Sequence, residues 1–276
     1  MKWELQREWF EMCKDVCGLK AIEENPRGLE NAYKWYVNFL ERLDFKIELI
    51  FNDDAKYRPI IVAVRDPGEG YDSYLGFFQH YDVEPIHASW ETSPWHLTKK
   101  GNRVFGRGIS DNIGPFIQRL LVIEKEPIGN GIVFVIQGEE EIGSPFAQLA
   151  YPQLKLPNVS LWVEETGYFY KNGNNRVLII DKKNELSSLI DEIKLVNSRD
   201  GKQTMVRYRP LNKAFGAEKC PCLSHLLKQS PYIAIGPNDD TSKIHGPNES
   251  MSLDYLEVSA LHIKSILNFR GDLDNR

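Results

Sequence analysis

The sequence predicts an α/β fold of three layers, in which helices cover both faces of a mixed, mainly parallel central sheet. The chain has 276 residues and is 42% hydrophobic, so it is long and apolar enough to bury a large core. Short apolar runs typical of strands alternate with longer stretches of helical periodicity. Alternating elements of this kind form sheets that are covered by helices on both sides. We therefore expect a single domain over residues 1–276.

The elements follow from the spacing of apolar residues along the chain. Two helices are expected first, over residues 1–20 and 29–43, where apolar side chains recur at close to helical spacing. Strands are expected at the apolar runs 46–51, 59–64, 74–79, 131–137, 159–163 and 232–235. Further helices are expected at 114–123, 144–151, 224–227 and 252–269. Residues 181–213 are rich in charged and amide side chains with weak periodicity, which indicates a polar excursion from the domain.

Composition excludes several classes of partner. Lys and Arg total 34 against 39 Asp and Glu, giving a formal net charge of −5, and no basic block suggests a nucleic-acid or anionic-membrane surface. No apolar stretch approaches the roughly 20 residues that span a bilayer. The N-terminus lacks the basic-then-apolar build of a secretion signal. The four cysteines are too few for a disulfide scaffold in a chain of this length. We therefore expect a cytoplasmic protein.

The most informative feature is the run of three glutamates, Glu139, Glu140 and Glu141, which follows the apolar stretch 132–136. Adjacent carboxylates at the end of a buried strand are costly to fold unless a cation gathers their charge. The alternative is an acidic turn that faces solvent, as most charge runs do. The run alone does not distinguish a cation site from a solvated acidic turn, so the rest of the chain has to be considered.

Further acidic and imidazole residues follow predicted strands, and ligands of open α/β sheets bind beyond the carboxyl ends of strands. His80 and Asp82 come directly after the strand 74–79, and alternate residues of an extended chain share one side. The Asp82 carboxylate could therefore accept a hydrogen bond from the ring nitrogen of His80 that a metal does not use. The pair Glu164–Glu165 follows the strand 159–163.

A glycine-rich turn, Gly106-Arg107-Gly108, leads to Asp111 just before the helix 114–123. Its carboxylate could bridge two cations with its two oxygens, although capping of the helix by Asp111 or Ser110 is an alternative. His245 stands in a fifth cluster that ends at Glu249. A mixture of imidazole and carboxylate ligands suits zinc better than calcium or magnesium.

These stretches carry a resemblance that covers residues 76–168 and 231–250. The chain resembles the co-catalytic zinc metallopeptidase family that includes carboxypeptidase G, succinyl-diaminopimelate desuccinylase, aminoacylase and carnosine dipeptidase. The stretches that carry it, in the family's order, are Gln79-His80-Tyr81-Asp82-Val83-Glu84-Pro85, Trp90, Val104-Phe105-Gly106-Arg107-Gly108-Ile109-Ser110-Asp111, Glu139-Glu140-Glu141-Ile142-Gly143-Ser144 and His245-Gly246-Pro247-Asn248-Glu249. The resemblance implies a zinc exopeptidase-like fold with two Zn²⁺ ions, for which Co²⁺ or Mn²⁺ could substitute.

Carried over position by position, the resemblance implies that His80 ligates one zinc ion and that Asp111 bridges both. Glu141 and His245 would hold the second ion. The remaining ligand would be Glu165, with Glu164 as the alternative.

Two further roles are implied. Asp82 would orient His80, and Glu140 would be the general base that takes a proton from a metal-bridging water. One departure from the family concerns the lid, because typical members carry a lid or dimerisation domain of roughly a hundred residues before the last histidine. Here the interval from Glu165 to His245 is only 80 residues, so the lid is expected to be missing or reduced to the excursion at 181–213.

The resulting hypothesis is a metallo-amidohydrolase or metallopeptidase of the dipeptidase, carboxypeptidase or deacylase type. It would cleave an amide or peptide bond of a small N-acyl amino acid or short peptide. The alternatives are a binding or structural homologue that lost turnover with its lid, an aminopeptidase-like enzyme, and a biosynthetic tailoring amidase. Without the domain that usually dimerises, a monomer is favoured.

Overall fold

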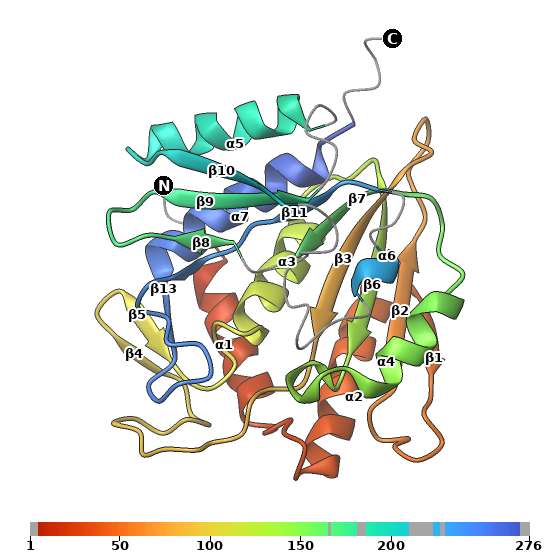
Figure 1. Ribbon diagram of the computed structural model, residues 1–276, viewed down its shortest axis with the longest axis vertical. Helices are drawn as coiled ribbons and strands as arrows, with labels where there is room; N and C mark the ends of the chain where they lie inside the picture. The colour runs from red at the N-terminus through yellow and green to blue at the C-terminus, as the bar shows by residue number, and fades with distance from the viewer. Residues whose placement is uncertain (1–4, 165–166, 181–185, 210–222, 227–229, 271–276) are drawn as a thin grey trace.

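The computed structural model describes residues 5–164, 167–180, 186–209, 223–226 and 230–270, and it confirms the predicted α/β class (Figure 1). The helices are α1 (Gln6–Cys17), α2 (Pro26–Arg42), α3 (Ile113–Lys125), α4 (Pro145–Ala150), α5 (Ser187–Arg199), α6 (Leu223–Leu226) and α7 (Leu253–Leu267). The strands are β1 (Lys46–Ile50), β2 (Ile60–Arg65), β3 (Tyr74–His80), β4 (Thr98–Lys100), β5 (Arg103–Phe105), β6 (Gly131–Gln137), β7 (Val159–Glu164), β8 (Tyr168–Phe169), β9 (Asn175–Ile180), β10 (Thr204–Arg209), β11 (Tyr232–Ala234), β12 (Asn238–Asp239) and β13 (Ser250–Ser252). Short 3₁₀ helices lie at Glu140–Ile142 and Tyr151–Gln153.

The main sheet is mixed, with a parallel centre. Its strand order is β1-β2-β6-β3-β7-β11-β9-β8-β12, and β10 pairs with β9. The central strands β6, β3, β7 and β11 are parallel to one another, whereas β1 and β2 form an antiparallel edge. A separate small sheet joins β13, β5 and β4. The parallel centre brings the carboxyl ends of β3, β6 and β7 to one edge of the sheet.

Both faces of the sheet are buried, because alternate residues of the central strands enter different clusters. Phe77 and Phe134 point into the larger core, which helices α1, α2, α3, α5 and α7 complete. Phe78 and Val135 point into a smaller core under α4 and the 3₁₀ helix Tyr151–Gln153. This arrangement gives the three layers that continuous apolar strands such as β6 predict.

Local sequence explains the two N-terminal helices. In α1 the buried residues Trp9, Cys13 and Val16 recur at helical spacing, and the Trp9 indole N–H donates to the Gly114 carbonyl oxygen at 2.9 Å. Helix α2 begins at Pro26 after Asn25, whose side chain accepts from the Gly28 N–H at 3.1 Å. Among the described helices, none is both long enough and apolar enough to cross a membrane.

The part of residues 181–213 that the structure describes forms α5 and β10. The strand β10 pairs in parallel with β9, and α5 packs against α7. Its buried residues Leu189, Ile190 and Ile193 belong to the larger core. The described portion of this segment therefore extends the main sheet.

Candidate metal centre

The site lies where β3 and β6 end. The two strands pair in parallel with His80 opposite Gln137, and the acidic run then turns into the 3₁₀ helix Glu140–Ile142. The register therefore sets His80 beside the glutamates, which lie 60 residues further along the chain. A single turn of helix is enough to bring Glu140 and Glu141 back over the end of the sheet.

Asp111 is held between two imidazoles. His80 Nε2 lies 3.1 Å from Asp111 Oδ1, and His245 Nε2 lies 3.0 Å from Asp111 Oδ2. His245 Nε2 also lies 3.0 Å from Glu141 Oε2. Each oxygen of the Asp111 carboxylate thus faces a different histidine, although the three residues come from segments far apart in the sequence.

Asp82 supports two of these residues. Its carbonyl oxygen lies 2.9 Å from His80 Nδ1, and its Oδ1 lies 3.4 Å from the same nitrogen. Because a carbonyl oxygen can only accept, Nδ1 carries the proton, and Nε2 is the nitrogen directed at Asp111. Asp82 Oδ2 accepts from the Glu141 backbone N–H at 2.9 Å. The nearer partner of the His80 ring is therefore the backbone of Asp82, while the carboxylate fixes the glutamate turn.

The three consecutive glutamates have separate environments. Glu139 Oε1 accepts from the Ala147 N–H at 2.9 Å and from the Phe146 N–H, so its carboxylate caps the start of α4. Glu141 is buried and reaches His245, as described above. Glu140 lies beside His80, and its charge raises the pKa of that ring. The run is therefore not a solvated acidic turn.

The electrostatics of the metal-free site favour protonated imidazoles. Burial alone would lower the pKa of His80, but hydrogen bonds to Asp111 and Asp82 hold it well above its ordinary value. Burial would also lower the pKa of His245. Hydrogen bonds to Asp111 and Glu141 outweigh this effect and raise the pKa of His245 to about 10. The two histidines in turn hold the pKa of Asp111 well below its usual range. Protons here neutralise negative charge that a cation would otherwise balance.

Burial raises the pKa of Glu140 to about 8, with His80 opposing and the carboxylates of Asp111 and Glu141 adding to the shift. A carboxyl group poised near neutrality is suited to taking up and returning a proton.

The residues present offer the ligand types that a divalent cation requires. His80, Glu140 and Glu141 form one group whose ligand atoms all lie within 4.8 Å of one another, and Glu84, Glu141 and His245 form a second. Two ligands at about 2.1 Å from a tetrahedral zinc ion are themselves about 3.4 Å apart. The nitrogen–oxygen separations of 3.0–3.1 Å around Asp111 are close to that value. Sequence reasoning assigned no role to Glu84.

The fifth predicted ligand, Glu165, lies outside the described residues. Its alternative, Glu164, is the last residue of β7 and is buried. Val163 pairs with Phe77, so Glu164 ends its strand at the same edge as His80. Of the cysteines, Cys13 and Cys17 are buried free thiols, and Cys220 and Cys222 lie outside the described residues.

Sequence reasoning missed the role of Glu249. It is fully buried, and its carboxylate accepts from the Arg107 guanidinium at 2.7 Å and from the Ser110 N–H at 2.8 Å. It is therefore not available to recognise a substrate amine. The only signal was its presence in the same cluster as His245.

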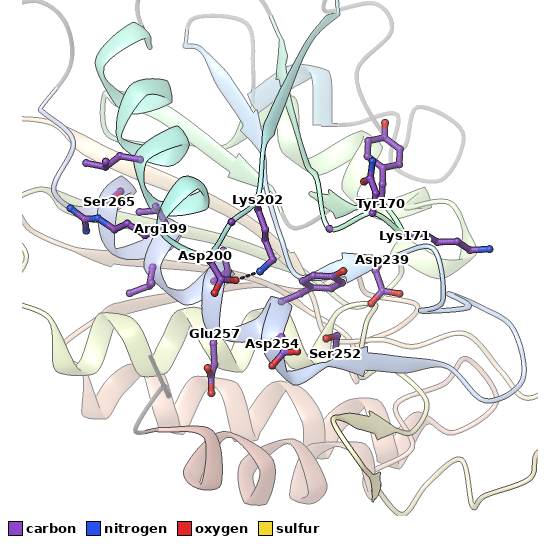
Figure 2. A pocket seen from close by; sticks show the side chains of 18 of the residues that line it. Tyr170, Lys171, Arg199, Asp200, Lys202, Asp239, Ser252, Asp254, Glu257 and Ser265 are labelled. Atoms are coloured by element: carbon purple, nitrogen blue, oxygen red, sulfur yellow. Dashed lines mark ion pairs between the residues drawn. The ribbon is translucent and has the colours of Figure 1, made fainter.

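A separate cavity of about 1280 Å³ lies among α5, α7 and the loops that follow β8, α5 and β12 (Figure 2). Its lining is mixed in charge and includes Lys202, which is paired with Asp200 and lies over the Tyr255 ring. None of the side chains proposed as metal ligands lines it. The candidate metal centre and this cavity are therefore distinct features.

Comparison with known proteins agrees with the geometry. Residues 76–167 match the family described as peptidase family M20/M25/M40. The matched stretch contains His80, Asp111 and the glutamate run. A human Beta-Ala-His dipeptidase is 33% identical over 95 residues, which is 31% of this chain and 18% of that protein. A succinyl-diaminopimelate desuccinylase of Novosphingobium aromaticivorans is 30% identical over 105 residues, which is 37% of this chain and 28% of that protein.

The likeness to solved structures extends over nearly the whole chain. The solved structure of the di-peptidase Dug1p from Saccharomyces cerevisiae superposes with a TM-score of 0.77 at 10% sequence identity, covering 96% of this chain and 95% of that one. By sequence, however, the matches span only 8 to 28% of the length of the first curated relatives. The fold is thus common to this chain and the solved structures, whereas the sequence similarity covers only part of each curated relative.

Proposed function

We propose that the protein is a zinc-dependent hydrolase that cleaves the amide or peptide bond of a small N-acyl amino acid or short peptide. The observation that carries this proposal is the Asp111 carboxylate, each of whose oxygens faces the Nε2 atom of a different histidine at 3.0–3.1 Å. Dipeptidases and a desuccinylase among the relatives support a small amide substrate.

The ligands in this proposal are His80, Asp111, Glu141 and His245, with Glu165 or Glu164 completing the set. The arrangement supports two ions, because Asp111 has one oxygen for each imidazole. Two divalent cations held there would polarise a substrate carbonyl and make a water acidic enough to react at neutral pH.

The protein's own residues move the proton. Glu140 lies beside the ligand groups, and its pKa of about 8 allows both protonation states near neutrality. In the proposed reaction, its carboxylate takes a proton from the attacking water. It then returns the proton to the amine nitrogen as the C–N bond breaks, so that the products are a carboxylate and a free amine. Asp82 keeps the His80 ring and the Glu141 backbone in place through the contacts described above.

We also propose that residues 1–276 work as one catalytic domain without a separate lid, and as a monomer. The incorporation of α5 and β10 into the main sheet supports the first point. Sedimentation velocity of the zinc-loaded protein would give a single species of about 32 kDa if the second point holds.

The test is the substitution Glu140→Gln, which keeps the size of the side chain and removes its basicity. We expect turnover to fall by about 10²- to 10⁴-fold with bound zinc unchanged, measured on a panel of dipeptides and N-acyl amino acids. The matched control is Glu48→Gln, because Glu48 is exposed on the edge strand β1, far along the sheet order from the site. Undiminished activity in Glu140→Gln would remove the proposed base. Bound zinc without hydrolysis of any substrate by the wild type would instead favour a binding homologue.

A further inference from the structure

The buried ion pair Arg107–Glu249 connects the segments that carry three of the proposed ligands. The Arg107 and Glu249 side chains are 1% and 0% exposed, and their charged atoms are 2.7 Å apart. A charge pair removed from water in this way costs free energy unless its remaining donors and acceptors are satisfied. Its presence beside the candidate metal centre therefore calls for a physical reason.

Glu249 holds the Asp111 loop through the backbone. Besides the guanidinium, its carboxylate accepts from the N–H groups of Gly108, Ser110 and Asp111 at 3.2, 2.8 and 3.2 Å. Four donors thus occupy the roughly four acceptor positions that a carboxylate offers. The orientation of the turn that presents the Asp111 side chain is fixed by this single group.

Arg107 holds the segment that carries His245 and the segment that follows His80. Its Nη2 donates to the carbonyl oxygen of His245 at 3.1 Å and to that of Pro85 at 3.3 Å. Pro85 lies three residues after Asp82, in the segment that follows His80. The guanidinium also lies over the Trp90 ring, with its carbon 5.3 Å from the ring centroid. Only a forked, planar side chain can donate hydrogen bonds to Glu249 and to these two carbonyl oxygens at the same time.

The loop that carries His245 needs such support. Lys243, His245 and Asn248 all have left-handed backbone angles, with φ of 53°, 60° and 59°. Residues other than glycine stay in this region only where their surroundings hold them there. The described contacts that do so include the Arg107 bond to His245 and a bond from the Glu91 N–H to the Asn248 side chain at 2.9 Å.

We propose that Arg107 and Glu249 are positioning residues, which together fix Asp111 and His245 at ligand distance before any metal binds. This inference rests on the proposed function only for the identity of the ligands. It adds that the site is preorganised by a brace, defined as the Arg107–Glu249 pair, that touches neither substrate nor metal.

The test compares Arg107→Lys and Glu249→Gln with the wild type. Lysine keeps the charge beside Glu249 but lacks the fork. Glutamine keeps the shape of Glu249 but turns an amide N–H₂ group towards the N–H donors that the carboxylate accepts from. The control is Asn197→Ala, which removes buried hydrogen bonds to Asn175 and Thr204 at 3.2 and 2.7 Å and touches no ligand segment. It accounts for any effect of lower overall stability.

Two measurements are made on chelator-treated protein. In a zinc titration against a chromophoric chelator, we expect Arg107→Lys and Glu249→Gln to lose about 10- to 100-fold in zinc affinity, and the control to stay close to the wild type. In amide hydrogen exchange without metal, we expect peptides covering 240–249 to exchange faster in both brace variants and unchanged in the control.

Unchanged exchange of 240–249 in both brace variants would overturn the inference, as would zinc affinities that fall no further than that of Asn197→Ala. If the wild type itself binds no zinc, the proposed function fails, while the exchange measurement still decides whether the brace holds the loop.

Discussion

Zinc binding should release at least two protons per chain at pH 7. In the metal-free protein the two imidazoles are protonated, because Asp111 and Glu141 hold the pKa of His245 at about 10 and hydrogen bonds hold that of His80 well above its ordinary value. A group with a pKa of 10 is about 99.9% protonated at pH 7, and histidine must be neutral to bind a metal.

Zinc binding should also release a proton from the fraction of molecules in which Glu140 is protonated. With a pKa of about 8, it is about 90% protonated at pH 7 in the metal-free protein. Nearby cations favour the ionised carboxylate and so expel this proton as well. The total is therefore between two and three protons. The apparent zinc affinity should rise with pH, by about 100-fold per unit for every two protons displaced.

The assay is calorimetric titration of zinc into the chelated protein, in buffers that differ in ionisation enthalpy, repeated at several pH values. His87→Ala serves as a control, because His87 is exposed and paired only with Glu84 among the described contacts. His245→Ala should release one proton fewer. Release of less than one proton by the wild type, or an affinity independent of pH, would refute the assignment of both histidines as ligands.

Two further predictions concern stability. The chelated protein should lose stability as the pH rises from about 4.5 to about 8, because the raised pKa of Glu140 means that the folded state binds more protons than the unfolded state in this range. Thermal unfolding at a series of pH values checks this, and Glu140→Gln should flatten the slope; an equally steep slope in that variant would contradict the assignment. Separately, Phe134→Ala should lower the free energy of unfolding by about 3–5 kcal/mol, because Phe134 is fully buried among Phe45, Phe77 and Phe116 with ring centroids 5.1–5.6 Å away. Urea unfolding measures this loss, and a change below about 1 kcal/mol would show that the core is not packed as described.

The sequence predicts the strands that have continuous apolar runs. Its predictions are weakest at the edge of the sheet that contains β10. The strand β6 is buried along its whole length, so its composition alone predicts it. By contrast, β10 is an edge strand with exposed Arg207 and Tyr208, and its sequence does not alternate in a way that predicts a strand. Strands such as β4, β5 and β13 have three residues each, too few for any periodicity.

The candidate site was predictable to the extent that its ligands follow strands. His80 and the glutamate run stand at the ends of β3 and β6, where the sheet itself brings them together. The brace was not predictable, because the contact between Arg107 and Glu249 spans 142 residues and depends on how two irregular loops meet. Nor did the pattern show that Glu139 caps a helix while its neighbour Glu140 faces the ligands.

The hydrogen bond from the Trp9 indole to the Gly114 carbonyl oxygen joins helix α1 to helix α3. This contact between the N-terminal helix and the core limits how far the protein can be shortened for expression. The stretch that matches the M20 family begins at residue 76, after α1, α2, β1 and β2. A fragment trimmed to that boundary would leave β6 without its neighbour β2 and would uncover Phe116, whose ring stacks on Tyr36 of α2 at 4.3 Å. Such a fragment would present an open apolar face and aggregate, so recombinant versions should retain the helices at the amino end.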